Sequence, residues 1–283
     1  TGAATLARDK DSASYFMSRM GYSVAEGKAF ALSSTNKHER DRTIGRAYRY
    51  ATRLGLPIIT KPNSGSRGRR VVLAYTKHEF YDAMEGIFAY DNVALVQRKA
   101  IGEDHRIVVL DGTVITACER RPLSVTGDGQ STIEALLRQK QRIFDQIDQP
   151  SRINPRNSSI TRVLQRRKMS LESVPQEGER VALMDTANLM SGGEAIDVTA
   201  SLHPGIAQTA INLTRDMGLY LSSVDMIVDG NISEQNPFVI LEINSAPGLD
   251  HFLNTRATKA KSVEDMYFDV MMSFFGRSRP NNL

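Results

Sequence analysis

The apolar residues of this chain repeat with a helical period in some segments and alternate as in a strand in others. Helices are predicted at residues 9–20, 37–54, 76–87, 203–217 and 262–275. Strands are predicted at residues 56–62, 71–74, 93–97, 106–110, 113–118, 219–228 and 237–243. The Asp111-Gly112 pair between two of these runs is typical of a hairpin turn. Because strands and helices do not alternate regularly, the pattern predicts an α+β fold with antiparallel sheets.

The middle of the chain has a weaker pattern. Ser131-Thr132-Ile133-Glu134 has the spacing of a capping box, so Ser131 is expected to cap a helix. Residues 148–193 then mix proline, asparagine, arginine and glycine without a clear period, and a connection of this length is usually functional. Neither an internal repeat nor a Pro- or Ser-rich linker is visible, and two subdomains are expected to meet near Arg98.

The composition is that of a globular protein. The 283 residues are 41% hydrophobic and 24% charged, enough for one large domain or two small ones. No apolar run approaches the roughly 20 residues that cross a bilayer, and residues 1–9 lack the pattern of a secretory signal. The chain begins without Met, so we expect a processed or trimmed piece of a longer protein. The single cysteine, Cys118, is expected to be an inert core residue, which suits a reducing cytoplasm.

The net charge of +4 comes from 36 basic and 32 acidic residues. A nucleic-acid binder usually carries a basic stripe, whereas here the basic residues are dispersed. The one short run, Arg166-Arg167-Lys168, is interpreted as a solvated face. We therefore expect neither a nucleic-acid nor a membrane partner.

The strongest chemical pattern joins Asp225 to the segment that contains Glu242 and Asn244. Strand alternation places Glu242 and Asn244 on one face and Leu241 and Ile243 in the core. If the strands fold back near residue 233, Asp225 comes opposite Glu242, where the two carboxylates repel unless a cation lies between them. Oxygen ligands of this kind suit magnesium. A polar sheet face with unrelated acids is the alternative.

A second pattern is Lys61 followed by a glycine-rich turn at residues 63–69. Backbone amides of such a turn can bind phosphate oxygens, with the lysine as a neighbouring charge. The segment is not a P-loop, because no Gly-Lys-Ser or Gly-Lys-Thr follows. An ordinary turn with a surface lysine would give the same pattern.

Three weaker segments are residues 97–106, 119–122 and 188–193. The first leads from an apolar strand through a glycine turn into acidic residues, as in a hinge that holds a base and a ribose, although a plain loop would look alike. In the second, Arg120 and Arg121 point to opposite faces of a strand, so at most one faces a given site. The third is rich in backbone donors and is uninformative alone.

Taken in order, these segments resemble the ATP-grasp superfamily, and most of all the ATP-grasp domain of cyanophycin synthetases and bifunctional glutathione synthetases. The resemblance covers residues 9–249. Its motifs are Asp9-Lys10, Thr60-Lys61-Pro62, residues 102–106, Arg121-Pro122, residues 125–129, residues 185–189, Ser191-Gly192-Gly193, residues 196–199, Asp225 and residues 242–248.

The resemblance implies a role for each matching residue. ATP phosphates would be held by Lys10, Lys61 and a mobile loop that includes Ser64, Gly65 and Ser66. Adenine would lie against the hinge of Gln97, Arg98, Lys99 and Ala100, with Asp104 on the ribose. Two magnesium ions, with manganese as an alternative, would be bound by Asp225, Glu242 and Asn244. Groups near the γ-phosphate and the acyl substrate would be Arg106, Arg121 and Asn188.

The family also implies an organisation: two α+β subdomains with antiparallel sheets that clasp ATP. Residues 1–25 would form a leading helix packed on the C-terminal subdomain, residues 26–98 the small subdomain with the glycine-rich loop, and residues 99–283 the C-terminal subdomain with the metal site. Two departures stand out. Many relatives have an acid where Gln97 stands, and the family usually has a further domain before Asp9, so an N-terminal domain or a homo-oligomer partner is expected to complete the substrate pocket.

The implied activity is that of an ATP-dependent carboxylate–amine ligase acting on amino acids or peptides through an acyl-phosphate. No Ser-His-Asp or Cys-His set suggests a covalent protein nucleophile. The alternatives are a kinase that stops at phosphoryl transfer, an ATP-binding domain without ligase activity of its own, and a nucleic-acid-binding module. The acidic Asp225 and Glu242 argue against the last of these.

Overall fold

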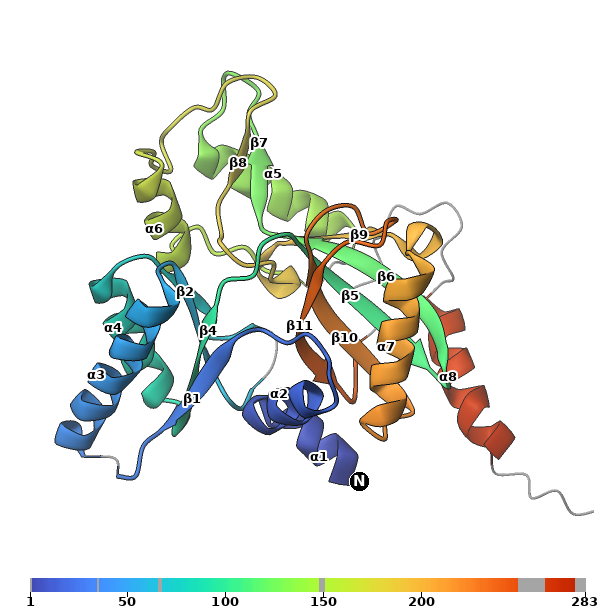
Figure 1. The fold of residues 1–283 in the computed structure, drawn as a ribbon. Coiled ribbons are helices and arrows are strands. Elements are labelled where there is room, and N and C mark those ends of the chain that lie inside the picture. Colours follow the sequence, from blue (N-terminus) through green and yellow to red (C-terminus); the bar gives the residue numbers. More distant parts are fainter. Residues whose placement is uncertain (1, 35, 66–67, 148–150, 249–262, 278–283) are drawn as a thin grey trace, which may run out of the picture. The chain divides into compact units, whose positions relative to one another are not determined.

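Three β-sheets organise the computed structural model, which describes residues 2–34, 36–65, 68–147, 151–248 and 263–277 (Figure 1). The chain divides into two compact units. The first comprises Thr1–Cys118, Val198–Gly248 and Lys261–Leu283, and the second comprises Glu119–Asp197 and Leu249–Ala260. The prediction of an α+β fold is confirmed, whereas the predicted division into residues 1–25, 26–98 and 99–283 stays a prediction.

The smaller sheet of the first unit has the strand order β1-β4-β2-β3. Its strands are β1 (Gly27–Ala31), β2 (Ile58–Pro62), β3 (Val72–Ala74) and β4 (Val93–Arg98). Two helices, α3 (Lys37–Leu54) and α4 (Lys77–Phe88), pack on one face and bury a core that includes Ile44, Phe80 and Ile87. Because side chains alternate along a strand, Ile58, Ala94 and Val96 point into this core while Lys61 and Gln97 lie on the other face.

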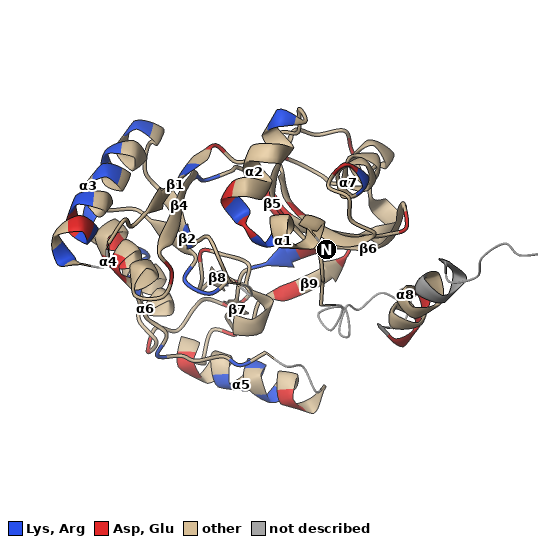
Figure 2. Ribbon diagram, turned by 90° about the horizontal axis from the view of Figure 1, so that it is seen from below, with Lys and Arg blue, Asp and Glu red and all other residues tan. Residues whose placement is uncertain are grey.

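The local sequence explains where these two helices begin. Asn36 caps α3 by accepting from the backbone N–H of Glu39, and Thr76 and Glu79 form a reciprocal capping box at α4. Basic residues follow α3 on its solvent side (Figure 2), where Arg42, Arg46 and Arg49 are exposed.

The larger sheet has the order β11-β10-β5-β6-β9. Its strands are β5 (Glu103–Leu110), β6 (Thr113–Arg121), β9 (Glu194–Asp197), β10 (Leu221–Val228) and β11 (Phe238–Asn244). The expected hairpin lies between β5 and β6, with Asp111 and Gly112 both at positive φ. Cys118 is buried in β6, as predicted.

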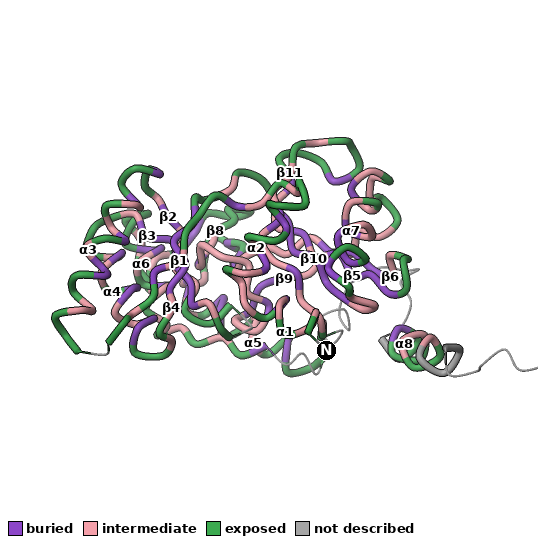
Figure 3. Tube along the Cα trace, turned by 60° about the horizontal axis from the view of Figure 1, so that its bottom comes forward, coloured by how far each residue is buried: buried purple, intermediate pink, exposed green. Residues whose placement is uncertain are grey.

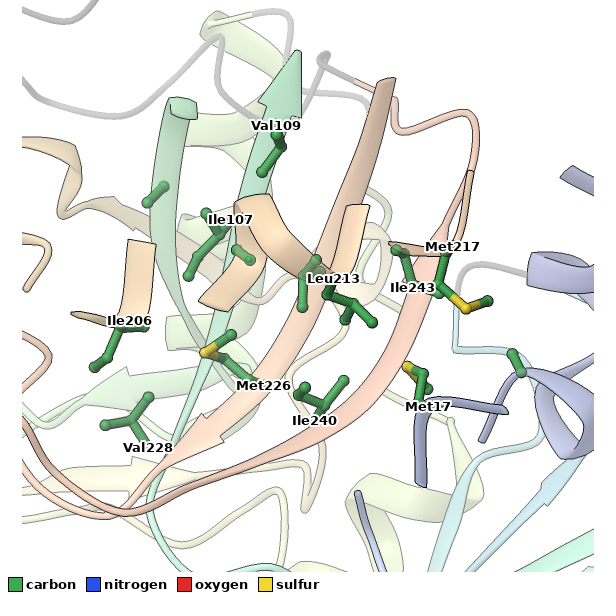
Figure 4. Close-up of a cluster of buried hydrophobic side chains, with 14 of the residues drawn as sticks. Met17, Ile107, Val109, Ile206, Leu213, Met217, Met226, Val228, Ile240 and Ile243 are labelled. Carbon is green, nitrogen blue, oxygen red and sulfur yellow. The ribbon is translucent and has the colours of Figure 1, made fainter. Parts of the chain in front are cut away.

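One face of this sheet carries the main core, which helices α2 (Lys10–Arg19) and α7 (Pro204–Asp216) help to form. Figure 4 shows Met226 and Ile240 of the strands among Leu213 and Met17 of the helices. The N-terminal segment packs against this core through Met17 of α2 and through a short helix, α1 (Gly2–Arg8). The sequence did not predict α1. β5 and β10 contain long runs of buried residues, which are purple in Figure 3.

The second unit is built on a two-stranded sheet of β7 (Ser124–Thr126) and β8 (Arg180–Ala182). Helices α5 (Ile133–Gln146) and α6 (Ser158–Arg166) share a core with it that includes Val125, Leu137 and Ile160. The sequence did not predict β7, β8, α6, β1 or β9. It also placed the start of α5 one residue early: Thr132 is the cap, while the Ser131 hydroxyl donates to Asp128.

Two 3-10 helices, η1 (Leu189–Ser191) and η2 (Thr199–Ser201), and the last helix α8 (Val263–Arg277) complete the described elements. The predicted start of this helix at residue 262 lies outside the described residues. No helix in the described part of the chain is long and apolar enough to cross a membrane.

Candidate active site

The candidate metal ligands lie on the face of the larger sheet opposite the main core. Val224, Met226 and Val228 of β10 point into that core, so the residues between them point to the other face. We call this the site face. Pairing of β10 with β5 and β11 lines up three cross-strand rows on it: Asp104–Ile227–Val239, Arg106–Asp225–Glu242 and Val108–Ser223–Asn244.

The predicted pairing of Asp225 with Glu242 is confirmed by the strand register. Asn244 lies beside Glu242 on the same face and donates an Nδ2 hydrogen bond of 3.2 Å to its Oε1. Two carboxylates and an amide oxygen are thereby collected on one side of β10 and β11.

The prediction that Leu241 points into the core is wrong. The register between β10 and β11 shifts at Asp225 and Met226, because Met226 pairs with Ile240 and Asp225 pairs with Glu242. Leu241 is therefore the extra residue of a β-bulge and is only partly buried. Ile240 and Ile243, three residues apart, both reach the main core, and Glu242 is still directed to the site face.

Arg106 supplies a positive charge beside Asp225 that the sequence did not predict and that offsets the expected repulsion between the two carboxylates. Arg106 Nε and Nη2 donate to the two Asp225 oxygens at 2.8 and 2.7 Å, a bidentate ion pair. Asp225 is 2% exposed, so this charged pair is formed in a buried part of the sheet and fixes the orientation of the carboxylate. Arg106, predicted near the γ-phosphate, thus lies directly beside a predicted metal ligand.

Lys61 lies on β2 of the smaller sheet and is electrostatically affected by the carboxylates of the site face. It is 7% exposed, and no hydrogen bond of its ammonium to another described residue is found in the structure. Burial lowers the pKa of Lys61; the nearby Lys10 acts in the same direction, and Glu242 and Asp225 oppose it. Lys10, Glu242 and Asp225 therefore all lie near enough to Lys61 to affect its charge.

The start of the glycine-rich turn is held by two side chains from outside it. Lys10 Nζ donates to the carbonyl oxygens of Asn63 and Gly65 at 3.2 and 2.9 Å. On the other side, the N–H and the hydroxyl of Ser64 both donate to Asp91 Oδ2 at 2.7 Å. The predicted phosphate contacts Lys10, Ser64 and Gly65 are thus brought together in the first unit, and Ser66 lies outside the described residues.

The predicted hinge starts at the end of β4. Gln97 is 4% exposed and lies on the same sheet face as Lys61, whereas the Arg98 side chain is used elsewhere, donating to Glu26 and to the Leu54 carbonyl. Gly102 follows at φ +121°, and a Cβ there would lie 2.1 Å from the Val228 carbonyl oxygen, so only glycine fits. The hinge therefore enters β5 against the end of β10 and leaves Asp104 on the site face.

The two remaining predicted residues belong to the second unit, where both have local partners. Arg121 Nη2 donates to Glu119 Oε2 at 3.1 Å, two residues back on the same strand face. Asn188 caps η1 by accepting from Met190 N–H at 3.0 Å. These contacts account for the local structure and neither support nor oppose a role toward a substrate.

The donor set of the first unit fits a hard cation that is completed by ligand oxygens. Among the described residues, no group of three His, Cys, Asp or Glu side chains is arranged to hold a metal by itself. Asp225, Glu242 and Asn244 supply only part of an octahedral shell, which is how magnesium is bound in sites that share it with substrate phosphates. Lys10 and Lys61 add positive charge beside that position.

Sequence reasoning missed Asp91, and it included Asn63 in the glycine-rich turn without predicting its contacts. Asn63 Nδ2 donates to Asp9 Oδ2 at 3.0 Å, and the Asp11 N–H donates to Asn63 Oδ1 at 3.0 Å. Both contacts join residues more than 50 positions apart, so no local pattern signals them. A polar residue directly after a strand that ends in Lys61-Pro62 was the one available hint.

Comparison with known proteins supports this description. Residues 7–134 match the RimK-like ATP-grasp domain family. Cyanophycin synthetase of Trichormus variabilis is 34% identical over 208 residues, 69% of this chain and 22% of that protein. The glutathione biosynthesis bifunctional protein GshAB of Listeria welshimeri is 25% identical over 222 residues, 76% of this chain and 28% of that protein. The chain thus spans less than a third of the length of these relatives.

Solved structures agree on the fold. A bifunctional glutathione synthetase from Pasteurella multocida aligns with 97% of this chain and 36% of its own, at a TM-score of 0.59 and 20% identity. D-alanine–D-alanine ligase from Bacillus anthracis aligns with 98% of this chain and 71% of its own, at a TM-score of 0.57 and 13% identity. The resemblance inferred from the motifs is confirmed, and this chain is a protein of the ATP-grasp fold with a RimK-like ATP-grasp domain.

Proposed function

We propose that this chain is an ATP-dependent carboxylate–amine ligase that forms an amide or peptide bond through an acyl-phosphate. The observation that carries the proposal is the placement of Asp225, Glu242 and Asn244 on one face of the larger sheet. Lys61 of the smaller sheet and Lys10 of α2 lie within electrostatic range of the two carboxylates. Charges of both signs that lie close together in a partly buried site are suited to binding a metal-bound polyphosphate.

ATP and magnesium are the cofactors that this site supports, with manganese as an alternative ion. Lys10, Lys61 and the turn after Pro62 would hold the phosphates, and Asp104 would hold the ribose. Residues 97–100 would receive the adenine, largely through backbone groups. Asp225, Glu242 and Asn244 would bind two ions, which neutralise phosphate charge as phosphoryl transfer develops.

In the proposed reaction, the protein positions the reacting groups and stabilises their charge. A substrate carboxylate attacks the γ-phosphorus and ADP leaves, and an amine attacks the resulting acyl carbon with loss of phosphate. Arg106, fixed by Asp225, directs positive charge toward the transferred group. Arg121 and Asn188 are proposed to act on the acyl substrate. No protein nucleophile takes part.

Amino acids or peptides are the proposed substrates, since the similar proteins are named as cyanophycin, glutathione and D-alanine–D-alanine forming enzymes. A further N-terminal domain or a second copy of the chain is proposed to complete the substrate pocket. Cytoplasmic location stays a prediction that rests on the single buried cysteine.

The test is a screen for magnesium-dependent ADP release with a panel of amino acids and short peptides, together with mass spectrometry of the products. A ligase gives ADP and a condensed product when both a carboxylate and an amine are present. A kinase gives ADP with a phosphorylated acid, which hydroxylamine traps, and no condensation. Nucleotide binding without ADP release under any condition would contradict both and favour an ATP-binding domain without activity of its own.

A further inference from the structure

Ser223 carries a buried hydroxyl that has no hydrogen-bond partner. Its side chain is 0% exposed, and among the described residues only Ser223 Oγ and Arg40 Nε are buried side-chain polar atoms without a partner. Buried polar groups are nearly always paired, because desolvation without a compensating hydrogen bond is unfavourable. An unpaired hydroxyl in the middle of a sheet therefore calls for a functional explanation.

The position of Ser223 points to the metal ligands. It lies two residues before Asp225 on β10, so both side chains are on the site face. Its cross-strand neighbours there are Val108 of β5 and Asn244 of β11. Val108 is apolar, so Asn244 is the only polar side chain directly opposite, at the Cβ separation of about 5 Å that cross-strand pairs have.

Asn244 itself has a different partner in this structure, since its Nδ2 donates to Glu242 Oε1. If Glu242 binds a cation, as the proposed function requires, its oxygens turn toward the ion and become weaker acceptors for the Asn244 amide. The Asn244 oxygen must face the same ion to serve as a ligand, and in that orientation its Nδ2 is best served by an acceptor other than Glu242.

We propose that Ser223 is a positioning residue of the metal site: its Oγ accepts the Asn244 amide hydrogen that Glu242 releases, leaving the Asn244 oxygen to serve as ligand. Such outer partners orient the ligands of metal sites and raise metal affinity. The unpaired hydroxyl is then the acceptor held ready for the loaded state. This inference rests on the proposed function, because it needs a cation at Glu242.

The adjacent residue offers a matched control. Ser222 is also 0% exposed, but it points to the opposite face, where its hydroxyl lies 2.7 Å from Thr214 Oγ1. Removing the Ser222 hydroxyl breaks a formed hydrogen bond, whereas removing the Ser223 hydroxyl breaks none. The two neighbouring serines should therefore respond in opposite ways.

The experiment measures thermal melting without ligands, and Mn²⁺ binding by electron paramagnetic resonance with a non-hydrolysable ATP analogue, on the full chain. Ser223→Ala should leave the metal-free melting temperature unchanged or raise it by about 2 °C, and it should weaken Mn²⁺ binding about ten- to a hundredfold. Ser223→Thr, which keeps the hydroxyl, should retain the wild-type affinity. Ser222→Ala should lower the melting temperature and leave Mn²⁺ affinity within about twofold.

Wild-type Mn²⁺ affinity in Ser223→Ala would overturn the role of Ser223. If that variant melts lower than wild type, Ser223→Cys decides, because it fills the same space with a weak acceptor; wild-type affinity in this variant would overturn the proposal as well. A wild-type chain that binds no Mn²⁺ with the nucleotide analogue would instead overturn the proposed function, and this inference with it.

Discussion

The polar residues selected from the sequence fall into two regions that behave differently. In the first unit, Lys61 is buried without a hydrogen bond to a described residue, and Glu242 accepts a hydrogen bond from the Asn244 amide. In the second unit, Arg121 pairs with Glu119, and Asn188 caps η1. The first group keeps electrostatic capacity for a ligand, while the second already satisfies its own hydrogen bonds.

This difference indicates where binding free energy can come from. A buried charge that lacks a full set of partners destabilises the empty protein and stabilises the loaded one. A side chain with a local partner contributes mainly to the stability of its own unit. We therefore expect nucleotide affinity to depend on the first region, and the second region to affect turnover and local stability.

The largest effect is expected for Glu242→Gln, which keeps the shape and removes one charge. Turnover should fall by about a hundredfold or more, because a carboxylate that neutralises metal and phosphate charge is lost. The metal-free protein should lose about 1 kcal/mol of unfolding free energy, since Glu242 is the charge that favours protonated Lys61 most. ADP release and thermal melts with and without magnesium-ATP test this.

Glu234→Gln, in an exposed loop, is the control for Glu242→Gln and should behave as wild type. Full turnover in Glu242→Gln, or a melting-temperature gain from magnesium-ATP equal to that of wild type, would show that Glu242 is not a metal ligand.

The next effect is expected for Lys61→Met. ATP-analogue affinity should fall about ten- to a hundredfold, because a charged contact to phosphate contributes roughly 1.5–3 kcal/mol. The metal-free variant should be more stable than wild type at neutral pH, because burial disfavours the protonated Lys61. Calorimetric titration and chemical denaturation measure the two changes, and exposed Lys28→Met is the control.

The stability gain of Lys61→Met should depend on pH in one direction. The folded-state pKa of Lys61 is lowered by burial below the unfolded value of 10.5, so the folded wild type releases this proton before the unfolded chain does. Wild-type stability should rise from the folded pKa toward pH 10.5, and the advantage of the variant should shrink over that range. A gain that grows with pH would contradict this assignment.

A smaller effect is expected for Arg121→Met. Because Arg121 already pairs with Glu119, nucleotide affinity should stay within about twofold, while turnover should fall about tenfold if the guanidinium acts on the acyl substrate. Steady-state kinetics with the best substrate pair from the screen measures the split. Arg120 lies on the opposite face of the strand, so Arg120→Met serves as the control. Equal turnover in the two variants would show that Arg121 does not act on the substrate.

The smallest effect is expected for Asn188→Ala, which should cost about 1 kcal/mol of unfolding free energy through loss of the η1 cap. Asn188→Asp keeps the capping oxygen and should restore stability. If the amide also contacts substrate, the aspartate variant recovers stability without recovering turnover, which is the result we expect. Recovery of both by Asn188→Asp would reduce Asn188 to a structural role.

Much of the first unit was predictable because its signals are local. The bounds of α3 follow from Asn36 and Gly55, and α4 begins at the Thr76 capping box. The second unit was not predictable from local signals, because β7 and β8 have three residues each and pair across more than 50 positions of sequence. Two hydroxyl residues stand side by side before α5, and the local hydrogen bond from Ser131 to Asp128 leaves Thr132 as the cap.

Some features of the candidate site were also predictable from the sequence, and others were not. The pairing of Asp225 with Glu242 followed from strand alternation and a plausible turn, and it was found. The Arg106 ion pair, the Asp91 contact and the unpaired Ser223 were not predicted, because each depends on which strands become neighbours. Sequence pattern identifies residues that can do chemistry, but their partners come from topology.

The bulge at Leu241 changes how β11 tolerates insertion and deletion. Removing one residue from a strand normally turns every later side chain to the opposite face. Here the pairs Met226–Ile240, Asp225–Glu242 and Val224–Ile243 form a regular series once Leu241 is left out. A chain without Leu241 would keep Glu242 and Ile243 on their present faces and lose only the local bend. An alignment of this strand to a shorter relative should therefore place its one-residue gap at Leu241.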